Sequence, residues 1–141
     1  MAYKLGLDCK LYYSSSGVSG AKTLATNVRD VTLSVEATEA DLTTRGSGGW
    51  EAIVAALLKG SIEFDIVWDT ADAFFTALQT AFFAKSIIGI WVLDAATPSG
   101  QGLKADMSVL KFSRNEPLTG GVTVSVSLKP AYGTTPAWGT W

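Results

Sequence analysis

Alternating apolar and polar residues dominate the sequence, a pattern with a period of two that is typical of β-strands with one buried face. The clearest run is residues 122–129, "VTVSVSLK", and residues 5–11, 31–38 and 61–69 repeat the pattern. These runs predict an antiparallel sheet with its apolar side turned inward. Cys9 falls on the apolar side of the first run, so we expect it to be a core thiol rather than a nucleophile.

Two further segments depart from simple alternation. Residues 86–94, "SIIGIWVLD", are apolar on both faces, which predicts a central strand covered on both sides. In residues 103–112 the alternation slips by one position. Because such a slip would turn every later side chain to the other face, we expect a β-bulge near Val109–Leu110.

One helix is predicted over about residues 69–84, with Asp69 as its N-cap. Phe74, Leu78 and Phe82 recur at every fourth position, which places them on one face. We expect this apolar face to cover the sheet.

Two segments are less clear from the residues alone. Residues 50–57 consist mainly of Ala and Leu between glycines, which favours a helix by local propensity, although the neighbouring strands allow a strand. The end of the chain, about residues 130–141, is rich in Pro, Gly and Thr and is expected to be an irregular extension. Its Trp138 and Trp141 need a surface to cover them.

Composition indicates a surface that is largely covered by neighbours. The 141 residues fit one domain, and only 17% are charged, against about 25% in an average soluble domain. The net charge of −2 without a basic stripe argues against binding nucleic acid through its phosphates. A single cysteine, and no apolar run of signal-peptide or membrane-span type, lead us to expect a soluble protein made in the cytoplasm.

Catalytic chemistry is not indicated. The chain has no His, which excludes Ser-His-Asp and Cys-His systems and removes the commonest zinc ligand, so we expect no enzyme activity, no cofactor and no metal. Glu63 and Asp65 form the best carboxylate pair, yet they lie opposite the apolar set, where nothing would raise a pKa. A solvated or channel-facing sheet surface is the expected role of this pair.

A glycine-rich segment, "EADLTTRGSGG" over about residues 39–49, separates two of the predicted strands. It lacks the GxxxxGK[ST] pattern of a phosphate loop. It also has too little apolar surface to order itself, so we expect a flexible arm.

Three segments together resemble a known family. They are "DVTLSVEATEADLTTRGSGGW", "IEFDIVWD" running into the helix, and "FSRNEPLTGGVTVSVSLKP", which span about residues 28–130. In their order and spacing they resemble the tail tube proteins, or major tail proteins, of long-tailed bacteriophages. The resemblance implies a mainly β fold, an antiparallel sandwich or barrel-like domain with one flanking helix, and a strand at Trp50–Leu57. It also implies that six copies form a ring and that rings stack into a hollow tube through which DNA is delivered.

The resemblance assigns roles to particular residues. The arm would dock on a neighbouring subunit, through Leu42, Thr43, Thr44, Arg45, Gly46, Ser47, Gly48, Gly49 and Trp50. An acidic lining that repels phosphate would let the genome slide, and the candidates for it are Glu36, Glu63, Asp65 and Asp106. The implied partners are other copies of the chain and tape-measure, tail-tip and tail-terminator proteins, without a membrane. The implied location is the virion tail, with the host cytoplasm before assembly.

A carbohydrate-binding β-sandwich is the alternative function. Five Trp and four Tyr in a β-rich chain could supply exposed rings that stack on sugars. A tube of a secretion or contractile injection apparatus is a variant of the first interpretation. The two main interpretations differ in oligomerisation, because a sugar-binding module can work as a monomer and a tube subunit cannot.

Overall fold

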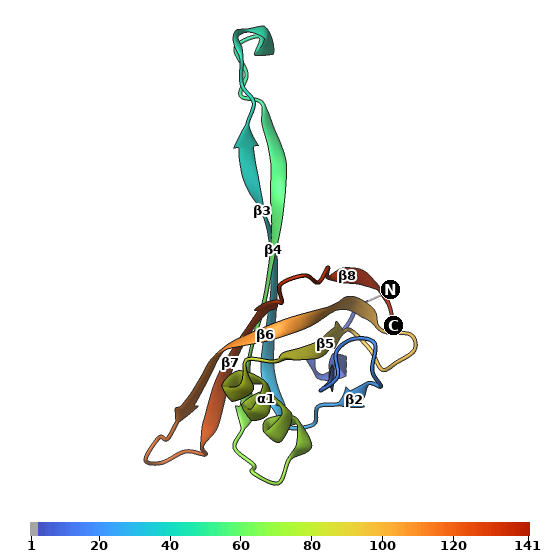
Figure 1. The fold of residues 1–141 in the computed structure, drawn as a ribbon, viewed down its shortest axis with the longest axis vertical. Helices are drawn as coiled ribbons and strands as arrows, with labels where there is room; N and C mark the ends of the chain where they lie inside the picture. Colours follow the sequence, from blue (N-terminus) through green and yellow to red (C-terminus); the bar gives the residue numbers. More distant parts are fainter. Residues whose placement is uncertain (1–2) are drawn as a thin grey trace.

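The computed structural model describes residues 3–141, which fold into one antiparallel β-sheet flanked by a helix (Figure 1). The sheet order is β2-β1-β5-β6-β7-β4-β3, and β8 pairs with β6 off this path. The strands are β1 Lys10–Ser14, β2 Thr23–Leu24, β3 Val28–Asp41, β4 Ile53–Val67, β5 Ile87–Leu93, β6 Gln101–Asn115, β7 Thr123–Pro130 and β8 Ala137–Thr140. The mainly β prediction with one flanking helix is confirmed, and within a single chain the sheet remains open.

Helix α1, Ala73–Ala84, packs on one face of the sheet and forms the main core. Phe74 and Leu78 are buried there, as their spacing predicts, Phe75 is buried beside them, and Phe82 is partly buried. The predicted N-cap, Asp69, is wrong. Asp72 caps the helix instead, because its carboxylate accepts a hydrogen bond from the Phe75 amide at 3.0 Å.

Strand β5 is covered on both faces, which confirms the prediction from its uniform apolarity. Ile88 and Ile90 belong to the core beneath α1. Trp91 and Leu93 point to the other side and pack with Tyr12 in a second small cluster. The expected bulge is also present, since the β6–β7 register shifts between Val109 and Lys111.

The beginning of the chain differs from the prediction. Alternation over residues 5–11 predicts a strand, but Gly6–Asp8 form a 3₁₀ turn and β1 starts only at Lys10. Cys9 is exposed, so its prediction as a core thiol is wrong. The pattern misled because alternation shows that one face is apolar and does not show that the protein covers it.

The end of the chain is more regular than expected. Residues 137–140 form β8, which pairs with residues 101–104 of β6. The ring of Trp141 lies under Lys104, with the Lys104 Nζ 3.7 Å from the ring centroid. Trp141 also donates from Nε1 to the Gly102 carbonyl at 3.1 Å. Trp141 therefore docks on its own chain, whereas Trp138 stays exposed.

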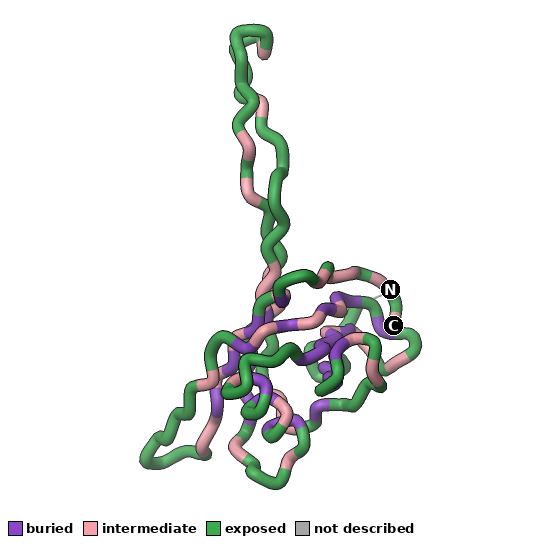
Figure 2. Tube along the Cα trace, viewed as in Figure 1, coloured by how far each residue is buried: buried purple, intermediate pink, exposed green. Residues whose placement is uncertain are grey.

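Strands β3 and β4 form a long hairpin that projects from the body (Figure 1). Its outer part is exposed almost throughout, while buried residues gather in the body (Figure 2). Strand β4 starts at Ile53, so the segment that local propensity left open is a strand from that residue. It runs without a break to Val67.

Candidate functional site

The projecting hairpin is the most conspicuous candidate surface. In its outer part β3 and β4 pair only with each other, and no third strand among residues 3–141 pairs with the outer edge of β4. Strand β7 pairs with β4 only from Ile62 onward, so residues 53–61 have a free outer edge. Large apolar side chains in this outer part face solvent, and Leu58 is 79% exposed. The others are Val35, Leu42, Trp50, Ile53, Val54 and Leu57. An exposed, long and apolar strand edge is a template for pairing with another chain.

The apolar row on the hairpin continues the core face of the sheet. Ile62 pairs with Leu33, Gly60 with Val35, and Leu58 with Ala37, all on the side of the sheet that is buried in the body. Beyond Ile62 neither α1 nor another strand covers this side among residues 3–141. The apolar side chains of this row therefore resemble a core surface that residues 3–141 of the same subunit leave exposed.

A bulge in the hairpin adds a second apolar position. The register shifts between Ala37 and Glu39, where β4 has one more residue than β3. Thr38 fills the gap, because its Oγ1 accepts a hydrogen bond from the Leu57 amide at 2.9 Å. The shift lets Leu57 and Leu58, neighbours in sequence, both be exposed.

The hairpin tip is held by local hydrogen bonds. The turn Arg45–Ser47 is a 3₁₀ helix in which Thr44 Oγ1 accepts from the Gly46 amide at 3.2 Å, and Ser47 Oγ accepts from the Thr44 amide at 3.1 Å. This reciprocal pair is a capping box. Gly48 completes the turn with a positive φ of 65°. In the structure the predicted arm, residues 39–49, comprises the end of β3 and the turn at the tip of the longer hairpin.

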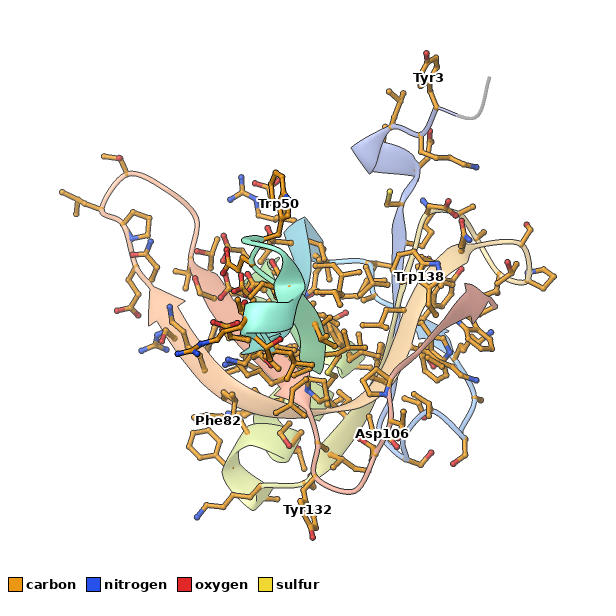
Figure 3. All side chains as sticks on the ribbon, turned by 90° about the horizontal axis from the view of Figure 1, so that it is seen from above. Tyr3, Trp50, Phe82, Asp106, Tyr132 and Trp138 are labelled. Atoms are coloured by element: carbon orange, nitrogen blue, oxygen red, sulfur yellow. The ribbon has the colours of Figure 1, made fainter. Side chains whose placement is uncertain are left out.

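Two further contacts brace the tip. Thr43 Oγ1 accepts from the Ala52 amide at 2.8 Å, and Asp41 accepts from the Thr43 amide at 2.9 Å. Hydrogen bonding from the Thr43 hydroxyl, and then from its amide, lowers the pKa of the Asp41 carboxyl. Trp50 follows the turn and is 80% exposed, and Figure 3, which views the molecule from above, labels it on the hairpin.

The second candidate surface is the polar face of the sheet, opposite α1. Glu63 pairs with Thr32 and Ser127, and Asp65 pairs with Ser125, so polar side chains run across three neighbouring strands. Ser125 Oγ donates to Asp65 Oδ1 at 2.9 Å. A shallow depression of about 260 Å³ lies over this face, and Asp30 and Lys111 also line it.

The two other predicted lining residues lie elsewhere on the sheet. Glu36 is opposite Lys59 in the projecting part of the hairpin. Asp106 is on β6, where its Oδ1 accepts a hydrogen bond from the Val18 amide at 2.7 Å and holds the loop after β1. The structure thus brings Glu63 and Asp65 together and leaves Glu36 and Asp106 apart from them.

Residues 3–141 contain no group of three or more acidic, Cys or His side chains that could hold a metal ion. No helix in this range is both long and apolar enough to cross a membrane.

The sequence reasoning missed the apolar part of this site. Leu57 and Leu58 lie at the end of the segment that local propensity left open between helix and strand, so they were not singled out. A signal was present, since an apolar run close to a glycine-rich turn indicates a surface that needs a partner.

Comparison with protein families identifies one match over most of the chain. Residues 10–131 match the family described as "Phage tail tube protein". No curated protein sequence is similar enough to count as a relative.

Solved structures with the same fold come from tails and related particles. The tail of an empty gene transfer agent particle, refined with C6 symmetry, has a chain with 19% identity and a TM-score of 0.77, covering 94% of this chain and 98% of that one. The SPP1 tail tube has 15% identity and a TM-score of 0.74, covering 99% and 81%. A chain of the anti-feeding prophage baseplate has 7% identity and a TM-score of 0.66, covering 97% of both.

Proposed function

The chain belongs to the phage tail tube protein family, and from this premise we propose how it builds a tube. It is a structural subunit, and six copies form each ring. The C6 symmetry of the similar gene transfer agent tail supports the number six. The observation that carries the proposal is the β3–β4 hairpin, whose exposed apolar row has no cover in the described chain.

The hairpin joins one ring to the next. Its unpaired part, Ile53–Ser61, is about 30 Å long at ~3.3 Å per residue, so it reaches well beyond the body it starts from. The tip residues Leu42–Trp50 lie at its far end and contact the neighbouring ring. Such head-to-tail contacts do not close on themselves, so they produce a filament.

The tip residues 39–49 are the proposed flexible arm, which becomes fully ordered when it docks on the neighbouring ring. Ordering costs about 1–2 kcal/mol per residue in backbone entropy. The capping box and the Thr43 contacts are local hydrogen bonds that favour the docked backbone and so reduce this cost.

The polar face with Glu63 and Asp65 lines the lumen. It lies on the face of the sheet opposite α1, so in this arrangement the helix faces the outside of the tube. The carboxylates on this face repel phosphate, and the hydroxyls carry no positive charge that would attract it. DNA can therefore pass without being held. Glu36 lies farther out on the same face of the β3–β4 ladder, opposite Lys59, and extends the lining toward the next ring.

The tube works with other tail components. Tape-measure, tail-tip and tail-terminator proteins are the proposed partners at its core and two ends. The subunit is made in the host cytoplasm and ends up in the virion tail. The family match favours this role over that of a sugar-binding module.

Electron microscopy of the purified protein at high concentration tests the proposal. We expect hollow tubes of stacked six-fold rings for the wild type. Leu58→Asp places a charge in the apolar row and should leave folded subunits that do not stack, whereas Leu58→Met keeps the apolar volume and should still form tubes. A wild type that stays monomeric, or a Leu58→Asp variant that stacks normally, would contradict it.

A further inference from the structure

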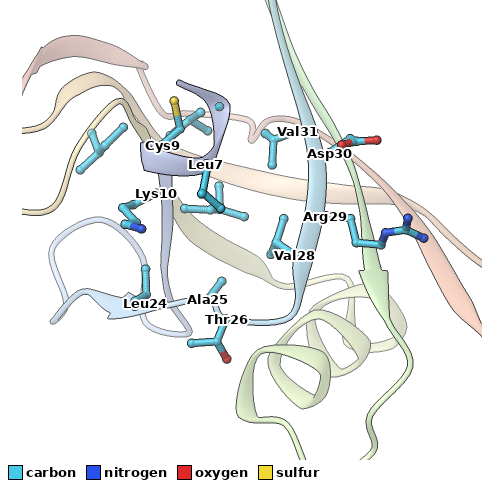
Figure 4. Close-up of a pocket in the computed structure, with 14 residues that line it drawn as sticks. Leu7, Cys9, Lys10, Leu24, Ala25, Thr26, Val28, Arg29, Asp30 and Val31 are labelled. Atoms are coloured by element: carbon cyan, nitrogen blue, oxygen red, sulfur yellow. The ribbon is translucent and has the colours of Figure 1, made fainter. Parts of the chain in front are cut away.

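An open cleft of about 810 Å³ lies beside the base of the hairpin. Figure 4 shows it between the N-terminal turn with β1 on one side and β3 on the other. Leu7, Leu11, Leu24, Val28, Val31 and Leu93 give it an apolar lining. Within the described residues this is the place where the two ends of the open sheet face each other.

One wall of the cleft is an unpaired strand edge. Strand β3 is the last strand of the sheet, and its pairing partner β4 lies on its other side. The backbone groups of β3 on the cleft side are therefore available to another strand. A small ligand would not satisfy a row of such groups, whereas an added β-strand would.

Charge also distinguishes the cleft from the hairpin. Lys10 and Arg29 line the cleft, together with the single carboxylate of Asp30. The hairpin segment 35–58 contains four carboxylates and one arginine, which gives it a net charge of −3. These carboxylates lie on β3 and beside the turn, whereas residues 53–61 of β4 carry Lys59 as their only charged residue. The hairpin as a whole thus complements the cleft in charge, and its β4 edge complements the cleft in polarity.

The projecting part of β4 has the properties that this cleft requires. Its outer edge is unpaired over residues 53–61, and Val54, Leu57 and Leu58 are exposed on it. The hairpin of the same chain leads away from its own cleft (Figure 1), so a second copy must supply the strand.

We propose that the cleft between the N-terminal turn and β3 receives the projecting hairpin of a second copy, with its β4 edge against the β3 edge. This inference rests on the proposed tube function and names the surface on which the hairpin docks. The pairing covers the apolar row of one copy with the apolar lining of the next. It also removes a free strand edge from each.

Cys9 provides a native probe of the contact. It lines the cleft, it is exposed, and it is the only cysteine in the sequence. A cysteine introduced by Ala55→Cys or Ala56→Cys is a small change at exposed positions of the hairpin. In tubes, mild oxidation should then join Cys9 of one copy to the hairpin of the next, giving a ladder of linked chains on non-reducing gels.

Two control variants make the readout specific. Leu118→Cys places an equally accessible thiol in the β6–β7 turn, at the other end of the molecule from the hairpin tip, and should not link to Cys9. Adding Cys9→Ser to the hairpin variants should abolish the ladder. In unmodified tubes, a maleimide should label Cys9 at least 10-fold more slowly than in dilute subunits.

The outcomes separate this inference from the proposed function. Tubes in which Cys9 reacts as fast as in free subunits, or links to position 118 instead of the hairpin, would overturn the docking site and leave the tube function standing. If the hairpin variants do not assemble, the labelling rate of Cys9 in wild-type tubes decides. Failure of the wild type to form tubes would count against the proposed function and against this inference with it.

Discussion

Thr38 and Leu57 are joined across the hairpin by a side chain that takes the place of a backbone partner. The Thr38 hydroxyl accepts from the Leu57 amide at 2.9 Å and lies 3.4 Å from the Leu57 carbonyl oxygen, to which it donates. This contact sits where the register shifts between Ala37 and Glu39. It keeps the ladder continuous through the bulge, so the hairpin beyond it stays in register with the part near the body.

Thr38→Val should therefore loosen the outer hairpin without unfolding the body. The variant keeps the shape of the side chain and removes the hydroxyl, at a local cost of about 0.5–1.5 kcal/mol. Hydrogen exchange at the Leu57 amide should speed up about 2- to 10-fold, with the melting temperature of the subunit unchanged. Thr38→Ser keeps the hydroxyl and should behave like the wild type. Equal exchange rates in all three proteins would show that the contact is unimportant.

Asp106 should act as an anchor for the loop after β1. Its carboxylate accepts from the Val18 amide, and Val18 packs against the cluster of Trp91 and Leu93. Asp106→Ala should lower the free energy of unfolding by about 1–2 kcal/mol, because the bond is charge-assisted and partly exposed. Asp106→Asn retains an acceptor and should lose less. Denaturant unfolding of dilute subunits measures both, and an Ala variant as stable as the wild type would contradict the role.

Tyr13 should make the fold sensitive to alkali. Burial, and secondly the negative charge of Asp72, raise the pKa of the Tyr13 phenol above its ordinary value of 10.0. The neutral form is thus favoured in the folded state, and this stabilisation is complete below pH 10 and lost as the pH rises through the raised pKa. Melting temperatures between pH 8 and 11.5 should fall more steeply for the wild type than for Tyr13→Phe. Tyr132→Phe, at a fully exposed position, should keep the wild-type slope.

Glu63 and Asp65 should keep the lumen from gripping DNA. Replacing both by Lys changes an acidic patch of the polar face into a basic one without touching the core. Tubes of this double variant should bind short DNA at low salt, with binding lost as salt is raised, whereas wild-type tubes should not. Glu116→Lys, in the β6–β7 turn, reverses an exposed charge away from this face and serves as the control. No difference in DNA binding would place these carboxylates outside the lumen.

Local spacing predicted those elements whose partners lie in the same chain. The Phe74 and Leu78 spacing located α1, and the slipped alternation located the bulge after Val109, because both patterns reflect burial inside the monomer. The first residue of the helix was not predicted correctly. Asp69 and Asp72 are both suitable N-caps, and only tertiary packing decides between them.

Segments whose partners lie elsewhere were harder to predict. Leu5 and Leu7 alternate like a buried strand and are exposed. Local propensity left residues 50–57 open between helix and strand, and only the family resemblance implied the strand, which β4 confirms from Ile53 onward. The glycines indicated where the turn of the hairpin lies, but no local sequence pattern predicted how long the two strands of the hairpin are. Propensity describes a segment in isolation, and here the decisive contacts are between strands and, as we propose, between copies.

The hairpin beyond Ile62 contributes no residue to the buried core of its own body. Its sequence is therefore free of the packing constraints that the core places on the rest of the chain, and under the docking we propose it is constrained by the surface that receives it. Changes in hairpin and receiving surface can then accumulate as matched pairs while the fold stays constant. Exchanging hairpins between related tubes would transfer compatibility, so that subunits of two lineages mixed in one cell would sort themselves by this one element.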